Sequence, residues 1–318
     1  MRHDFTANAG AFIAAILFGA SVVAVRVAVQ DIPPLTLAIL RFGQGGLLLL
    51  LLLLIWARDL LRIGWRDVPY LVLLGVIFFT IFPVTFNTGL RLTEASRGAL
   101  MLATMPLWSV LLARSAKRER LSTRQMCGVL LTFAGVGVVL AERGLTFVGT
   151  TVSLTGDVLM LVTALCGAVY GVLAKRMLTR YKALTVTAYT MMFGTLLLVP
   201  AVFVEDPSSA LTGMRTDTVM LVLFLGIFGG AIGYFLWTFA LTRLSPTQVA
   251  VYINLNPMIA ALLGATLLAE KLTGIFIAGF AAVLAGVLLV NLPGRVQLKR
   301  RSLTNRNGAY QIHPADRE

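Results

Sequence analysis

Apolar segments of about 20 residues, separated by short charged connections, constrain this fold more than any other feature. A helix of about 20 apolar residues is long enough to cross a bilayer. In lipid, each backbone polar group of a spanning segment must be paired internally, which leaves helices as the fold for such segments. Only 13% of the residues are charged, against roughly 25% in soluble proteins. The pattern therefore predicts an all-α polytopic membrane protein.

Ten such segments can be placed along the chain. They cover residues 8–28, 35–55, 69–90, 95–113, 124–141, 154–174, 184–204, 218–240, 247–268 and 273–292. With the N-terminus inside, twenty Lys and Arg residues fall in inner connections and six in outer ones. Cytoplasmic loops are enriched in these residues, so both termini are predicted to be cytoplasmic. The same rule accounts for the net charge of +13 without a nucleic-acid partner.

Two stretches of the chain repeat each other. A shift of 151 residues places 99–140 on 250–291 with eleven identities in 42 positions. Apolar composition does not explain four of them, which are Pro106 with Pro257, Glu119 with Glu270, Gly128 with Gly279, and Gly135 with Gly286.

Five spans per copy is an odd number, so the second copy must enter the membrane in the opposite orientation. Inverted repeats of this kind recur in secondary transporters, with the substrate site near the midplane. The prediction is two inverted five-helix repeats, 1–141 and 154–292. An extracytoplasmic linker at 142–153 joins them, and a basic cytoplasmic tail follows at 293–318.

Together these features resemble the drug/metabolite transporter superfamily, EamA type. The resemblance is carried by Gly19, Ser21 and Arg26 in the first span, by the stretch 33–41 that opens the second, and by the two proline-to-glutamate motifs. It implies a ten-helix fold around a central cavity, in bacterial inner-membrane carriers that often export amino acids and related metabolites. The chain departs from the family at Phe18, where many members have Trp, and at Arg26, where Lys is usual.

Two prolines fall near the middle of the fourth and ninth spans. Proline lacks the helical amide hydrogen and clashes with the carbonyl four residues earlier. Pro106 and Pro257 therefore predict kinks that release backbone carbonyls, which at membrane depth must face protein or a watery cavity. We interpret the two kinks as flex points on a transport path; packing kinks are the alternative.

Several polar side chains within the spans are candidates to line a substrate cavity. An amide in hydrocarbon needs a hydrogen-bond partner, which a polar substrate could supply. Asn254 and Asn256 flank the second proline, Tyr252 precedes them, and Asn87 lies in the third span. Ser21 is a further candidate in the first span. Hydrogen bonding or close packing between helices is the alternative for each.

Aromatic residues with one polar atom suit a cavity that takes both apolar and polar groups. The candidates are Trp108, Tyr170, Tyr234 and Trp237, with packing against the core or lipid as the alternative. Together with the prolines and amides, they predict a midplane site formed by spans 1, 3, 4, 6, 8 and 9.

Charges inside the spans are functional candidates by default. Arg41 lies about seven residues into the second span, and Asp157 lies at a similar depth in the sixth. Arg41 could bind a substrate carboxylate or pair with Asp157. Glu119 and Glu270 lie at the span ends and are expected to fix the geometry of their loops.

The spans contain no histidine, and their acidic side chains are not clustered. Metal sites and embedded proteases need such groups in clusters. We therefore expect no enzyme activity, no metal and no cofactor. The expected partners are a small-molecule substrate and the lipid bilayer, with the oligomeric state left open.

The sequence thus predicts an alternating-access secondary transporter. We expect it to export a small amphipathic metabolite, such as an amino acid or a derivative, across a bacterial inner membrane. Two alternatives remain: a broad effluxer of lipophilic compounds, and a non-transporting scaffold or receptor that acts through the basic tail.

Overall fold

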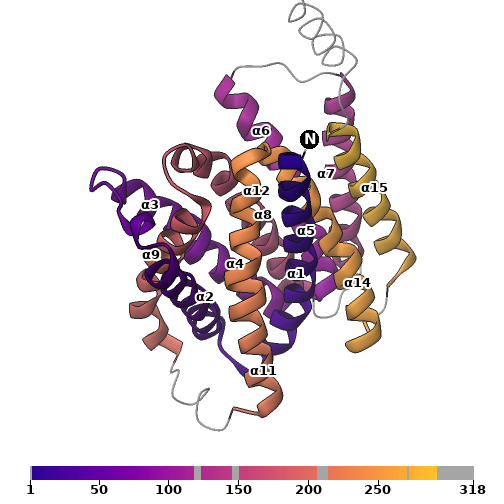
Figure 1. The fold of residues 1–318 in the computed structure, drawn as a ribbon. Coiled ribbons are helices and arrows are strands. Elements are labelled where there is room, and N and C mark those ends of the chain that lie inside the picture. Colours follow the sequence, from indigo (N-terminus) through magenta and orange to yellow (C-terminus); the bar gives the residue numbers. More distant parts are fainter. Residues whose placement is uncertain (1, 118–122, 145–149, 206–213, 271, 292–318) are drawn as a thin grey trace, which may run out of the picture.

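The computed structural model describes residues 2–117, 123–144, 150–205, 214–270 and 272–291 (Figure 1). Within these ranges the chain is helical, without strands, and eight helical segments are long and apolar enough to cross a membrane. Two shorter apolar helices, Met126–Val139 and Gly274–Gly286, lie where the fifth and tenth spans were predicted. The all-α polytopic fold is confirmed, while the count of ten and the orientation stay predictions. The tail and the centre of the linker lie outside the described residues.

The helices are named in chain order. The first half contains α1 (Arg2–Asp31), α2 (Pro34–Trp56), η1 (Arg58–Leu61), α3 (Val68–Gly75), η2 (Val76–Ile81), α4 (Phe82–Leu92), α5 (Ala95–Leu102), α6 (Met105–Lys117) and α7 (Thr123–Gly144). The second half contains α8 (Thr150–Leu178), α9 (Ala183–Val202), η3 (Phe203–Glu205), α11 (Thr216–Phe224), η4 (Leu225–Ile232), α12 (Gly233–Arg243), α13 (Pro246–Val251), η5 (Tyr252–Asn254), α14 (Leu255–Leu267) and α15 (Gly274–Asn291).

Some spans are interrupted at equivalent places in the two halves. The π-helical turns η2 and η4 interrupt the third and eighth spans, and the 151-residue shift places η2 within η4. Two residues, 103 and 104, separate α5 from α6, and η5 separates α13 from α14. Both breaks directly precede the repeated proline, since Pro106 and Pro257 lie in the first turns of α6 and α14. Proline fits there because the first-turn amides have no partner within the helix.

Contacts between the helices follow the same repeat. Helix α7 packs on α15, and α2 packs on α9, so these spans meet their own counterparts (Figure 1). Helix α1 packs on α12, and its counterpart α8 packs on α4. Exchanging the two halves therefore maps these contacts onto one another, which is what a duplicated five-helix unit predicts.

The glycines shared by the two copies of the repeat lie at the contact between α7 and α15. A Cβ added to Gly135 would lie 2.8 Å from the carbonyl oxygen of Gly279, and one added to Gly286 would lie 2.6 Å from that of Gly128. These four glycines form two of the sequence-repeat pairs, and the two close approaches exchange under the repeat. Small residues allow such approach of helix backbones in a membrane.

Two carboxylates cap helix N-termini at the predicted outer end of the bundle. Glu205 accepts hydrogen bonds from the amides of Leu35 (2.9 Å) and Thr36 (3.0 Å) at the start of α2. Glu270 accepts from the amides of Ala95 (2.8 Å) and Ser96 (3.2 Å) at the start of α5. The first-turn amides of a helix have no partner within it, and its dipole favours an anion there. Each cap joins the two halves of the chain.

Candidate functional site: a closed cavity between the two halves

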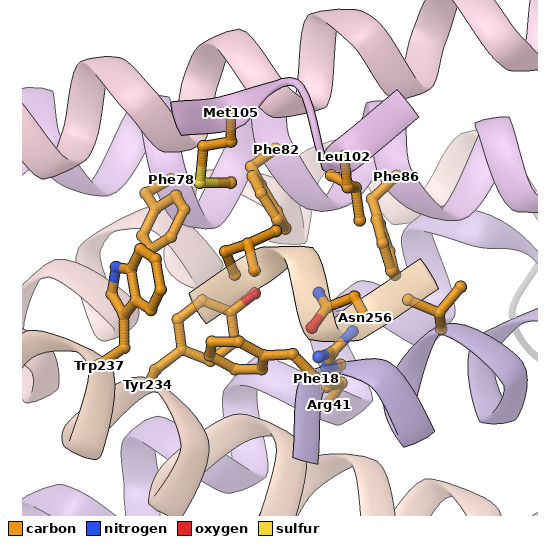
Figure 2. Close-up of a pocket in the computed structure, with 12 residues that line it drawn as sticks. Phe18, Arg41, Phe78, Phe82, Phe86, Leu102, Met105, Tyr234, Trp237 and Asn256 are labelled. Carbon is orange, nitrogen blue, oxygen red and sulfur yellow. The ribbon is translucent and has the colours of Figure 1, made fainter. Parts of the chain in front are cut away.

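Six spans enclose a small cavity near the middle of the bundle, of about 30 Å³ (Figure 2). That volume holds about two water molecules, and all of its lining residues except Phe18 are buried, so we call it the closed cavity. Its lining residues are Phe18, Val22, Arg41, Phe78, Phe82, Phe86, Leu102, Met105, Tyr234, Trp237, Ile253 and Asn256. They belong to spans 1, 2, 3, 4, 8 and 9, so the predicted sixth span is replaced by the second, which supplies Arg41.

Three pairs of lining residues occupy equivalent positions in the repeat. The 151-residue shift relates Phe86 to Trp237, Leu102 to Ile253, and Met105 to Asn256. In the first and last of these pairs, the member from the second half carries the polar atom. The cavity is therefore symmetric in its framework and asymmetric in its chemistry.

Aromatic rings form most of the wall. Phe78 stacks on Tyr170, with ring centroids 4.0 Å apart. Tyr234 contacts Phe18 at 4.8 Å and Phe42 at 5.4 Å between centroids. Such tilted and offset contacts are favourable arrangements of aromatic rings. The rings hold one another in place and make the wall flat and apolar.

Arg41 is the charged residue of the cavity lining. Only 2% of its surface is exposed, and its Nε and Nη1 atoms have no hydrogen-bond partner. Within the part of the chain that the structure describes, no carboxylate forms an ion pair with it. Its guanidinium lies over the rings of Phe42 (4.9 Å to the centroid), Phe86 (5.8 Å) and Tyr234 (5.9 Å). A buried cation held only by ring faces is a strong candidate to bind an anion.

Two further polar atoms of the lining are buried and unpartnered. These are the Oδ1 of Asn256 and the indole Nε1 of Trp237. Buried polar side-chain atoms in folded proteins mostly have a partner, and exceptions call for an explanation. In Figure 2, Arg41 and Asn256 lie toward one end of the cavity and Trp237 toward the other. A polar molecule bound at the first end would pair with Arg41 and Asn256.

The second intramembrane charge has a different partner from the one considered. Asp157 is fully buried and accepts hydrogen bonds from Arg97 (2.9 Å) and from the Thr93 hydroxyl (2.6 Å). Arg97 also donates to the carbonyl of Val139 at 2.6 Å. The Arg41–Asp157 pair is therefore not formed. Arg97, at the outer end of the predicted fourth span, is buried in α5 and neutralises Asp157.

Three predicted lining residues instead tie helices together, outside the cavity lining. The Asn87 Nδ2 atom donates to the Pro34 carbonyl at 2.8 Å. The Tyr252 hydroxyl donates to Asn8 at 2.7 Å, next to the first span. Trp108 donates to Thr104 at 3.2 Å, across the α5–α6 break. Hydrogen bonding between helices was the stated alternative for Asn87 and Tyr252, although the Asn87 Oδ1 atom has no partner. For Trp108 the stated alternative was packing against the core or lipid.

The other three predicted lining residues lie close to the cavity without lining it. Tyr170 is buried behind Phe78. The Ser21 hydroxyl donates to the Leu17 carbonyl at 2.7 Å and lies against Gly229, where an added Cβ would meet it. Asn254 belongs to η5, and its Oδ1 atom is buried without a partner. Ser21 thus follows the close-packing alternative.

The sequence analysis missed most of the apolar lining. Phe78, Phe82 and Phe86 recur every four residues, which places them on one helical face. This spacing could have indicated a cavity wall, but apolar residues at helical spacing occur on every span and do not single out this face. The repeat offered a better one, since Leu102 and Met105 are the counterparts of Ile253 and Asn256.

A second, more open cavity of about 710 Å³ lies at the predicted outer end of the bundle. Its lining includes Arg26 and Gln30, which continue along α1 the four-residue spacing of Phe18 and Val22 in the closed cavity. Glu270, the cap of α5, lines its other side. One face of α1 therefore runs from the closed cavity to the open one.

Among the described residues, no group of three or more His, Cys, Asp or Glu side chains is arranged to hold a metal ion. The polar groups of the closed cavity are a guanidinium, an amide, an indole and a phenol. This set suits binding of an organic molecule.

Comparison with known proteins shows which family the chain resembles. The model of the EamA-like transporter family matches residues 6–141 and again 154–292. An uncharacterized transporter of Archaeoglobus fulgidus is 27% identical over 273 residues, covering 86% of this chain and 94% of the relative. A probable terminal-alkyne amino-acid exporter of Streptantibioticus cattleyicolor is 29% identical, covering 71% of this chain and 74% of the relative. A crystal structure with 23% identity has a TM-score of 0.68 over 93% of this chain and 98% of its own, which shows the fold.

Proposed function

Because the chain belongs to the EamA-like transporter family, we propose that it is an alternating-access carrier of small amphipathic metabolites. The cargo is an amino acid or a derivative, moved outward across a bacterial inner membrane in which both chain termini are cytoplasmic. The Streptantibioticus cattleyicolor relative, named as a probable amino-acid exporter, supports this substrate class.

One observation carries the proposal: a closed cavity between the two halves, in whose lining Arg41, Trp237 and Asn256 have buried polar atoms without a partner in the protein. Leaving a buried polar group unpaired costs about 1–3 kcal/mol. A chain that served only as a scaffold would gain stability by replacing these groups with apolar ones. Their presence in a cavity lined by both halves supports transient pairing with a substrate.

The helix breaks give the cavity a way to open. At about 30 Å³ it is too small for a metabolite of this class, so binding requires the lining to separate. Spans 4 and 9 are interrupted directly beside lining residues, at 103–104 and at η5. We propose that the halves rock about these breaks, with Pro106 and Pro257 marking the flex points.

The face of α1 supplies a route to the outside. Phe18 and Val22 line the closed cavity, and Arg26 and Gln30 line the open one. In this proposal the substrate leaves along that face when the contact between Glu270 and α5 loosens. Export requires a matching opening at the cytoplasmic end in the other half of the cycle.

Broad efflux of lipophilic compounds is the second candidate, favoured by a wall in which six of the twelve lining residues are aromatic. A buried guanidinium argues against it, because a lipophilic compound would leave that charge unpaired. The two functions differ in their response to Arg41→Met. The replacement should abolish metabolite export and leave lipophilic efflux unchanged or improved.

Profiling of external metabolites tests the proposed function. Cells that overproduce the native chain are compared with cells producing the Asn256→Ala, Pro257→Ala double variant. Met258→Ala is the matched control, because Met258 lies on the same helix and is 55% exposed. A small amphipathic metabolite should accumulate outside with the native chain and with the control, and not with the double variant.

The opposite results are equally clear. Depletion of a supplied metabolite from the medium would show uptake and overturn the direction. Two results together would replace metabolite export with lipophilic efflux. The external-metabolite profile would be unchanged, and cells producing Arg41→Met would resist lipophilic compounds as well as cells producing the native chain.

A further inference from the structure

Resting on the proposed function, we propose that the closed cavity selects apolar monocarboxylates carrying a neutral hydrogen-bonding group next to the carboxylate. Arg41 binds the carboxylate and Asn256 contacts the neighbouring group. The substrate class is thus a 2-hydroxy acid or an N-acylated amino acid with an apolar side chain. A zwitterionic amino acid fits less well.

The first step is the charge of Arg41. Its Nε and Nη1 atoms are buried and unpartnered. Each of them forms, together with Nη2, an edge of the guanidinium that can bind a carboxylate through two parallel hydrogen bonds. The rings of Phe42, Phe86 and Tyr234 shield it from water without supplying a negative charge. An anionic group is the ligand that neutralises this cation.

The second step is the net charge of the ligand. The lining contains Arg41 and no carboxylate. The buried carboxylate of Asp157 is already bound to Arg97 and Thr93. An ammonium group in the cavity would therefore lie near a guanidinium with no carboxylate in the lining to offset it, and like charges at low dielectric repel strongly. A ligand of net charge −1 makes the occupied cavity neutral, whereas a zwitterion leaves one positive charge over.

The third step is the neutral polar group. Asn256 presents a buried, unpartnered Oδ1 atom to the same cavity, and Figure 2 shows it toward the Arg41 end. A hydroxyl or an acyl amide next to the carboxylate can donate to that oxygen. In the first half the equivalent position holds Met105, so this contact belongs to the second half alone.

The fourth step is the apolar body. Phe78, Phe82 and Trp237 form the wall away from Arg41 in Figure 2. Flat rings at this wall suit an aromatic or branched side chain. In Figure 2 Trp237 lies toward the other end of the cavity from Arg41, beside the apolar body of the substrate, so its indole Nε1 atom takes no part in binding the carboxylate.

Thermal melting of the purified full-length protein in lipid nanodiscs tests the inference with four probes. L-phenyllactate carries both groups, and 3-phenylpropionate lacks the hydroxyl. L-phenylalanine replaces the hydroxyl with an ammonium, and phenyllactamide removes the negative charge. The expected order of apparent affinity is phenyllactate, then phenylpropionate, then phenylalanine, with no measurable stabilisation by the amide.

Three variants assign the effect to residues. Arg41→Met should weaken phenyllactate binding at least about 30-fold, the range for truncating one partner of a buried charge pair. Asn256→Leu should remove the difference between phenyllactate and phenylpropionate, a factor of roughly 5. Arg243→Met removes an equal charge at an exposed position of α12 and should change neither value.

Stabilisation by phenylalanine or by the amide equal to that by phenyllactate would overturn the inference, as would native binding by Arg41→Met. Failure of every carboxylate to stabilise the native protein would overturn it too. If the external-metabolite profile still shows export, that failure falls on the substrate class and the carrier function stands. If the profile shows no export, the proposed function fails separately.

Discussion

Two arginines of this protein are almost equally buried but differ in their hydrogen-bond partners. Arg97 is 3% exposed and donates to Asp157 and to a backbone carbonyl. Arg41 is 2% exposed and has two nitrogen atoms without any partner. The first lies toward the predicted outer end, where carboxylates also cap α2 and α5. The second lies in the closed cavity.

The difference separates groups that hold the fold from groups that await a ligand. Removing a charge from water costs several kcal/mol, which a paired charge recovers and an unpaired one does not. Ring faces return about 2 kcal/mol to a desolvated cation, so they offset part of the cost for Arg41. The protein tolerates the remaining cost where the charge serves binding. At the outer end, the buried Asp157 and the half-buried Glu205 and Glu270 each accept hydrogen bonds.

The largest expected effect comes from breaking the paired arginine. Arg97→Met leaves Asp157 buried with only the Thr93 hydroxyl, and removing one partner of a buried pair costs about 3–5 kcal/mol. The variant should melt far below the native protein or fail to accumulate in the membrane. Yield and melting temperature in nanodiscs measure this.

The double variant Arg97→Met, Asp157→Leu is the control for that loss. With both charges gone, stability should return to within about 1 kcal/mol of native, since replacing an entire buried pair with apolar residues is near neutral. A double variant as damaged as the single one would show that Arg97 acts through packing alone.

A smaller effect is expected at the helix caps. Glu270→Ala removes the acceptor for the Ala95 and Ser96 amides, and losing such a cap costs about 0.5–2 kcal/mol. The melting temperature should fall, and the outer end should become easier to open, which hydrogen exchange of the α5 amides would report. Asp59→Ala, at an exposed carboxylate, should leave both measurements unchanged. Faster exchange confined to other helices would contradict the assigned role.

The smallest effect on stability is expected inside the cavity. Asn256→Met copies the residue found at the equivalent position of the first half, Met105. Because the Oδ1 atom of Asn256 is unpartnered, losing the amide should leave the free energy of unfolding within about 1 kcal/mol of native, or raise it. Export of the identified metabolite should nevertheless fall. A strongly destabilised Asn256→Met would mean that the amide supports the fold.

The sequence alone predicts the positions of the spans and the candidate polar residues better than it predicts which polar groups pair. Span positions, the repeat and the two proline sites follow from apolar length and from residues such as Gly135 and Pro257, because backbone pairing in lipid leaves few alternatives. Tyr234, Trp237, Asn256 and Arg41 were identified as candidates because polar atoms in apolar spans are few.

Side-chain pairing could not be read in the same way. The sequence suggested Arg41 as a partner for Asp157, whereas the packing of α5 against α8 brings Arg97 to it. Asn87 and Tyr252 looked like cavity residues until their partners, Pro34 and Asn8, were known. The sequence shows that a polar residue in a span needs a hydrogen-bond partner. The three-dimensional fold determines whether that partner is protein or ligand.

The most direct test of the central claim compares the melting temperatures of Arg41→Met and Arg97→Met, each without added ligand and in the same nanodiscs. If Arg41 is held for a substrate, Arg41→Met melts at or above the native temperature while Arg97→Met melts well below it. If Arg41→Met is destabilised as strongly as Arg97→Met, Arg41 is a structural residue, and the cavity is not built around an unpaired charge.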